Sequence, residues 1–170
     1  MSATRTALAA ALLATLLAAC GQAQDAATEA LTEQALEAST GQDVDIRTEN
    51  GRQTITVDSG QGRYQHTTGE KVPLPEDFPD DITLPEDYTV LSVMAMGPTQ
   101  SVVLRSDASM SELFEQIKAG QARRGWKETV SMQGAEGSML GFEKGGRGVL
   151  VNLRSDLEGQ TVVSLSLQAP

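Results

Sequence analysis

Six acidic residues lie within the eighteen residues from Pro73 to Val90, and no lysine or arginine lies among them. Carboxylates at this density suggest calcium binding, because calcium prefers oxygen ligands. An EF-hand loop, however, arranges its ligands around a central glycine and ends in a glutamate. This stretch has no glycine, and Pro79 interrupts its acids. A looser calcium site formed by Asp77, Asp80 and Asp81 is an alternative interpretation.

The same stretch repeats a pattern of leucine, proline, two acids and an aromatic residue. Leu74-Pro75-Glu76-Asp77-Phe78 is followed by Leu84-Pro85-Glu86-Asp87-Tyr88. Each proline restricts its own φ and pushes the preceding residue into extended geometry, so this chain is stiff. We predict that residues 73–88 form an acidic connector that packs on a surface with its acids solvated. Its predicted anchors are Leu74, Phe78, Leu84 and Tyr88, with Ile82 between them.

Other residue types with chemical potential are scarce, since His66 is the only histidine and Cys20 the only cysteine. A zinc site normally draws on several histidine or cysteine ligands. Catalysis by serine, histidine and aspartate would have to use His66, which lies in a polar stretch without a nucleophile elbow. We therefore predict no catalytic residue, metal or cofactor, and interpret His66 as a solvated loop residue.

The one basic cluster is formed by Lys118, Arg123, Arg124 and Lys127. It follows a predicted helix, and cations near a helix C-terminus complement the helix dipole. Two alternatives assign the cluster to an acidic partner or to the protein's own acidic connector.

The N-terminus has the features of a processing signal. Arg5 supplies a positive charge, and residues 7–19 are apolar apart from one threonine. This run is too short to span a membrane as a helix. It ends in Leu17-Ala18-Ala19-Cys20, which resembles the lipobox of bacterial lipoproteins. The alternative is an ordinary secretory signal followed by an incidental cysteine.

The lipobox resemblance implies cleavage before Cys20, leaving residues 1–19 as a signal peptide, and covalent lipid on that cysteine. Because Gly21 rather than aspartate follows, similarity to Gram-negative sorting implies the outer membrane, with the domain facing the periplasm. Several acyl chains would hold the protein firmly, since each buried methylene contributes about 0.8 kcal/mol.

Charge is distributed unevenly along the chain, whose net charge is −10. Residues 21–90 contain 15 acids and 4 bases, whereas residues 91–170 contain 8 of each. Nucleic acid is excluded as a partner on this ground, because phosphate contacts require clustered lysine and arginine. The acidic half also disfavours electrostatic adhesion to anionic lipid, so membrane attachment is assigned to acyl chains.

Residues 20–42 are predicted to be a lipidated tether, partly helical, with a thin apolar stripe at Ala27, Leu31 and Ala35. Residues 43–72 are predicted to be a β-hairpin followed by a polar loop that contains at most a short edge strand near Tyr64. Asn50-Gly51 favours a two-residue turn. That turn pairs Glu49 with Arg52, Ile46 with Ile55 and Val44 with Val57, which places the apolar residues on one face.

Residues 89–170 are predicted to form a β-β-α-β-β-β-β unit. Ser109-Met110-Ser111-Glu112 matches a capping box, and Gly125 is suited to end the helix that follows. Gly145-Gly146 favours a second tight hairpin, pairing Phe142 with Val149, Leu140 with Val151 and Ser138 with Leu153.

The Gly125-Trp126 junction, the Phe142-to-Gly146 turn and the terminal Thr-Val-Val-Ser-Leu strand together resemble a group of small bacterial lipoproteins. The strand and helix order also resembles the helix-grip domains of an outer-membrane assembly lipoprotein. The predicted fold is α+β: a curved antiparallel sheet with one main helix on one face, preceded by the hairpin and flexible tether.

The sequence predicts a membrane-anchored, non-enzymatic module that binds another protein of the cell envelope. An alternative function is a carrier of a small apolar ligand held between helix and sheet, and an enzyme is the least favoured class. The methionines at 94, 96, 110, 132 and 139 fit either core packing or an adaptable apolar groove. A deep apolar pocket under the helix would favour the carrier, whereas a filled core with an exposed sheet face would favour the interaction module.

Overall fold

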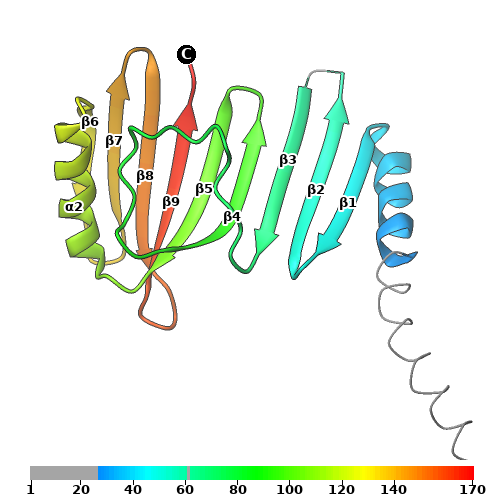
Figure 1. Ribbon diagram of the computed structural model, residues 1–170, viewed down its shortest axis with the longest axis horizontal. Helices are drawn as coiled ribbons and strands as arrows, with labels where there is room; N and C mark the ends of the chain where they lie inside the picture. Colours follow the sequence, from blue (N-terminus) through cyan, green and yellow to red (C-terminus); the bar gives the residue numbers. More distant parts are fainter. Residues whose placement is uncertain (1–26, 61) are drawn as a thin grey trace, which may run out of the picture.

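The computed structural model describes residues 27–60 and 62–170, so the predicted signal peptide and Cys20 lie outside the described residues. Nine strands form one open sheet in the order β1-β2-β3-β4-β5-β9-β8-β7-β6, and every neighbouring pair is antiparallel. Figure 1 shows one helix at each end of this sheet. The predicted α+β class with an antiparallel sheet is therefore confirmed.

The strands are β1 (Asp43–Glu49), β2 (Arg52–Ser59), β3 (Gly62–Gly69), β4 (Thr89–Met96), β5 (Thr99–Ser106), β6 (Lys127–Gln133), β7 (Ser138–Lys144), β8 (Arg147–Ser155) and β9 (Thr161–Gln168). Helix α2 spans Met110–Arg123, and a further helix, the N-terminal helix, covers residues 27–40.

The β1–β2 hairpin has the register that the Asn50-Gly51 turn predicts. Glu49 pairs with Arg52, and the pairing continues along the strands to Asp43 with Asp58. Asn50 and Gly51 have φ values of 54° and 74°, the left-handed geometry that this turn type requires.

Strand β3 differs from the polar loop that composition predicts for this stretch. It is eight residues long and pairs with β2 on one side and β4 on the other. Polar side chains are tolerated in this strand because neither face of the sheet is deeply buried here. The backbone hydrogen bonds to β2 and β4 hold the strand in place. As a result, the hairpin and the C-terminal strands belong to one sheet.

The C-terminal strands and helix follow the predicted order, and β7 and β8 show the predicted pairs from Phe142–Val149 to Ser138–Leu153. The capping box at α2 is present: the Ser109 hydroxyl accepts from the Glu112 N–H, and the Glu112 carboxylate accepts from the Ser109 N–H. Gly125, with φ of 79°, follows the helix.

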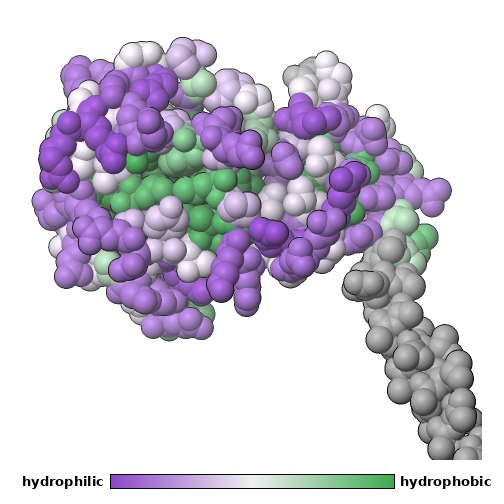
Figure 2. Space-filling view, viewed as in Figure 1, coloured by the Kyte–Doolittle hydropathy of each residue, from purple (hydrophilic) through white to green (hydrophobic). Residues whose placement is uncertain are grey.

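The main core lies on one face of the sheet, here called the helix face, between β4–β9 and a cover made of α2 and residues 70–88. Its fully buried residues come from both layers: Val102, Leu104, Leu113, Ile117, Leu140, Val151, Leu153, Val163 and Leu165. Residues 70–88 loop across β4, β5, β9 and β8 in front of the sheet (Figure 1). Figure 2 shows hydrophobic residues over the middle of this face, with hydrophilic residues around them.

The opposite side of the sheet is here called the open face, because within residues 27–60 and 62–170 neither α2 nor the connector lies on it. The strand register shows which residues lie on the open face, since directly paired residues of neighbouring strands share a face. Val93 pairs with the core residue Val102, so the neighbouring Met94 and Met96 point to the open face. The apolar residues of the β1–β2 hairpin lie on this open face, not on the helix face.

Candidate functional site

The connector is held on the helix face by its apolar residues. Val72 and Ile82 are buried, and Leu74, Phe78 and Leu84 pack against the core while partly buried. Tyr88 does not share this role, because 38% of its surface is exposed. The chain enters β4 one residue later, and there Val90 takes the buried position.

Asp81, in the middle of the connector, forms ion pairs with two basic side chains of the β7–β8 hairpin. Arg147 donates from Nη1 to Oδ1 at 3.0 Å and from Nη2 to Oδ2 at 2.6 Å, and Lys144 Nζ donates to Oδ2 at 2.8 Å. The hydrogen bonds from Arg147 and then Lys144 hold the pKa of Asp81 well below its ordinary value, against the opposing effect of burial. The same contact raises the pKa of Arg147. We call Asp81, Lys144 and Arg147 the clasp.

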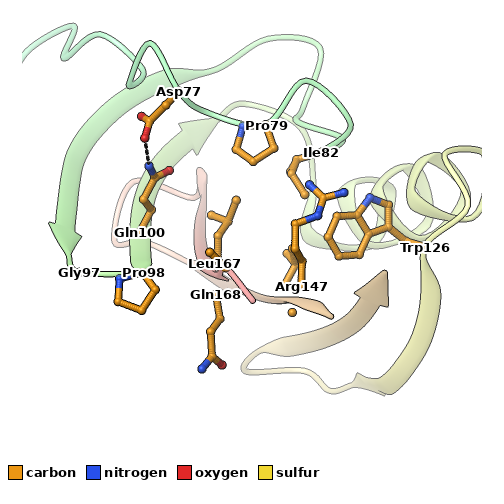
Figure 3. A pocket seen from close by; sticks show the side chains of 13 residues that line it. Asp77, Pro79, Ile82, Gly97, Pro98, Gln100, Trp126, Arg147, Leu167 and Gln168 are labelled. Atoms are coloured by element: carbon orange, nitrogen blue, oxygen red, sulfur yellow. Dashed lines mark hydrogen bonds between the residues drawn. The ribbon is translucent and has the colours of Figure 1, made fainter. Parts of the chain in front are cut away.

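Trp126, just beyond α2, completes the contact between the connector and the domain. Its indole N–H donates to the Asp81 carbonyl at 2.9 Å, and the Arg147 guanidinium lies 4.9 Å from the ring centroid. Arg124 donates to the Asp80 carbonyl at 2.6 Å. Figure 3 shows Arg147 standing beside the Trp126 ring. The connector is therefore fixed to α2 and to β7–β8 by polar groups as well as by apolar packing.

The acids of the connector do not converge on a common point. Asp77 accepts a hydrogen bond from the Gln100 amide at 2.8 Å (Figure 3), whereas the Asp81 carboxylate accepts from Arg147 and Lys144. In the described part of the chain, no group of three or more histidine, cysteine, aspartate or glutamate residues is arranged to hold a metal ion. The three carboxylates of the calcium alternative are therefore not brought together at one point.

A cavity of about 220 Å³ lies beneath the connector, beside the clasp (Figure 3). Pro79 and Ile82 line it from the connector, and Val149 and Leu167 line it from the sheet. Ligand pockets for drug-sized molecules usually measure about 300–1,000 Å³. This cavity is smaller, and it lies at the β4–β5 turn and the C-terminal end of β9 rather than under α2.

The predicted basic cluster is divided among separate partners. Lys118 bonds to Glu128 and to the Ser131 hydroxyl, and Lys127 bonds to Glu143. Arg124 alone reaches the connector, through the backbone of Asp80, and Arg123 is exposed. The cluster therefore does not form one joint surface, and part of it serves the acidic connector.

His66 is not a loop residue, because it lies within β3 and its Nε2 is 2.8 Å from the Ser92 hydroxyl on β4. The sequence interpretation missed this contact because it allowed only a short edge strand near Tyr64, not a strand paired with β4. A serine beside a histidine is the start of a nucleophilic site, but catalysis also requires an orienting group and oxyanion donors. Within the described residues, the recorded contacts of this pair include neither an acid nor oxyanion donors.

The open face has an apolar area at its N-terminal end, here called the β1–β4 patch. Its residues are Val44, Ile46, Ile55, Val57, Tyr64, His66, Met94 and Met96, which follow from the register of β1–β4. Met96 is 55% exposed, whereas Val44 and Ile46 are buried at 5% and 7%. A shallow hollow of about 590 Å³ lies at one end of the patch, where Val57, Tyr64 and Met96 line it together with the β4–β5 turn. Serines on β5 and β9 separate this patch from a second apolar area around Met132 on β6.

Comparisons with known proteins returned no matching family model, no matching curated protein and no matching solved structure. Among the described residues, no helix is both long enough and apolar enough to cross a membrane.

Proposed function

We propose that the protein is a non-enzymatic interaction module of the bacterial envelope, anchored to the outer membrane through lipid on Cys20 and facing the periplasm. The observation that supports this most is the difference between the two faces of the sheet. On the helix face, α2 and the connector cover the core, whereas the β1–β4 patch has neither on it: Met96 is exposed and most of the other patch residues are half-buried, although Val44 and Ile46 at the β1 end are buried. Partly exposed apolar residues grouped on an uncovered sheet face are typical of a surface that binds another protein.

The arrangement of the chain supports the same proposal. The N-terminal helix and β1 are at one end of the sheet, and the clasped connector and α2 stabilise the other end. In the proposal, residues 20–42, which include the N-terminal helix, are the tether, and the hairpin that follows lies nearest the membrane anchor. The partner is a protein of the same envelope, since a lipid-held module meets partners there.

The carrier alternative requires a cavity between α2 and the sheet, and the burial of the side chains there favours the interaction module instead. Leu113 and Ile117 on α2 and Leu140 on β7 have no exposed surface. The cavity beneath the connector is small and has Asp77, Gln100 and Arg147 in its lining. An apolar ligand of ordinary size would have to displace the clasped connector to enter.

In-cell crosslinking followed by mass spectrometry tests the proposed function. We expect one specific envelope protein to be recovered with the wild-type chain. We expect its yield to fall with Met96→Lys, which puts a charge in the β1–β4 patch. Leu157→Lys is the matched control, because Leu157 is fully exposed in the turn between β8 and β9. Recovery of no specific partner, or equal loss with both variants, would contradict the proposal.

A further inference from the structure

The N-terminal helix places two glutamates against the free edge of β1. Glu33 Oε1 accepts a hydrogen bond from the Ile46 backbone N–H at 2.5 Å, and Glu37 Oε1 accepts one from the Val44 N–H at 3.3 Å. Strand β1 is the terminal strand of the sheet, and β2 occupies its other edge. These two N–H groups therefore point out of the sheet, where another strand would bind.

The two carboxylates imitate the carbonyl groups of a neighbouring strand. Residues two apart on a strand lie about 6.8 Å from each other, because the rise is about 3.4 Å per residue. Residues four apart on a helix are separated by about 6 Å along its axis. Glu33 and Glu37 therefore match the spacing of Val44 and Ile46, and they occupy the positions that strand carbonyls would take.

The N-terminal helix, which covers the edge of β1, is held there weakly. Leu31 is 69% exposed and Leu36 is 38% exposed, so the helix buries little of its own large apolar side chains, although Val44 and Ile46 of β1 are themselves buried. A short helix without such burial is marginal in water. The side of the helix that meets β1 is acidic, and β1 contains Asp43, Asp45 and Glu49 with one base, Arg47, which pairs with Asp45 at 2.9 Å. Like charges on both sides oppose the contact that the two hydrogen bonds make.

The opposite edge of the sheet is protected differently. Strand β6 has an irregularity between Glu128 and Val130, and Lys118 from α2 bonds to it. Bulges and charged side chains are the usual devices that prevent strand addition at a sheet edge. Strand β1 pairs with β2 without an irregularity, so only the helix blocks its edge within the described residues.

We propose that the outer edge of β1 is a strand-addition site that the N-terminal helix covers until a partner displaces it. The segment it fits alternates basic and apolar residues. Basic side chains would face Asp43 and Asp45 on the helix face, and apolar side chains would continue the β1–β4 patch beside Val44 and Ile46. This inference rests on the proposed function, because it states how the partner protein would begin to bind.

The test uses the Cys20→Ala chain, which cannot be lipidated, and a capped peptide of alternating lysine and valine. A length of about eight residues matches a strand. Fluorescence anisotropy measures binding, and amide exchange by NMR follows the N–H groups of Val44 and Ile46. We expect Glu33→Ala with Glu37→Ala to speed exchange at both amides. We also expect this double variant to bind the peptide at least about tenfold more tightly than the chain with both glutamates, because the cover is gone.

In the double variant, the bound peptide should slow exchange at Val44 and Ile46 again. A peptide of the same composition with its lysines and valines in two blocks controls for charge alone, and Gln34→Ala controls for a change on the outer side of the helix. The inference is overturned if the alternating peptide does not bind the double variant, binds both chains equally, or binds without protecting those two amides. Such a result would leave the crosslinking at Met96 unaffected, so failure of this inference is distinguishable from failure of the proposed function.

Discussion

Asp81 is the single side chain on which the position of the connector depends most. Its carboxylate accepts three hydrogen bonds from two cations, and its backbone carbonyl accepts a fourth from Trp126. Only 22% of the side chain is exposed, so solvent screens these contacts less than it screens a surface ion pair. The sequence predicts that the acids of the connector are solvated as a group. Within residues 70–88, however, Asp81 alone among the acids forms ion pairs.

Replacing Asp81 with asparagine should lower the free energy of unfolding by about 2 kcal/mol near neutral pH, because two charge-assisted contacts are lost. Denaturant titration measures this loss. Asp87→Asn is the matched control, since Asp87 is an exposed acid of the same connector, and it should change stability by less than about 0.5 kcal/mol.

The same substitution has a predicted pH dependence. The folded-state pKa of Asp81 is depressed below the ordinary value of 3.8, so the unfolded chain takes up the proton first as pH falls. The stabilisation is therefore complete above this value, begins to fall as the pH drops below it, and is fully lost only below the lower folded-state pKa. The difference between wild type and Asp81→Asn should shrink below about pH 4. A difference that stays constant down to about pH 2 would mean that charge is not its origin.

The secondary-structure elements differ in how well the sequence predicts them. Turn chemistry at Asn50-Gly51 and Gly145-Gly146 and the capping box at Ser109 are local signals, and the register and helix start that they predict are found. Strand β3 has no such apolar signal, because its residues are polar and its order comes from two neighbouring strands. The clasp has no local signal either, since Asp81 lies 66 residues before Arg147.

The contact between α2 and the connector depends on Gly120. A methyl group at this buried helix position would collide with the side chain of Thr83. Gly120→Ala should therefore destabilise the protein by about 1–3 kcal/mol, although alanine favours a helix by about 1 kcal/mol over glycine. A double-mutant cycle with Thr83→Gly tests the cause. If the second substitution restores no stability, the collision with the connector is not responsible.

The start of α2 gives a second prediction for this element. Ser109→Ala removes the hydroxyl that accepts from the Glu112 N–H, and we expect a loss of about 1 kcal/mol. Ser111→Ala is the control, because Ser111 is also exposed in the first turn but is not part of the capping box. Equal effects of the two substitutions, measured by thermal unfolding, would contradict the role assigned to the cap.

The whole molecule is one sheet with two different surfaces. Connector and helix bury the C-terminal two-thirds of the helix face, while the β1–β4 patch lies on the reverse side. The sequence predicted that the hairpin's apolar residues share a face. It did not predict that this face is opposite α2, because the long connector between β3 and β4 leaves no local signal that relates the faces of the two parts of the sheet. Anchoring near the N-terminus would bring the patch and the β1 edge close to the membrane.

Anchoring has its own test at this scale. Cys20→Ala should abolish incorporation of labelled lipid and release the protein into the soluble fraction of the envelope, because the acyl chains supply the membrane affinity. Fractionation after metabolic labelling measures both effects. A variant that stays with the membrane would refute the lipid anchor.

The central claim is that a protein partner binds the open face, and position-resolved photocrosslinking in cells tests it most directly. A photoreactive residue replaces Met96 in the β1–β4 patch in one chain and Glu115 on the exposed side of α2 in the other. The account predicts one discrete crosslinked protein from position 96 and none from position 115. Crosslinking to the same protein from position 115 alone, or no product from position 96, would contradict it.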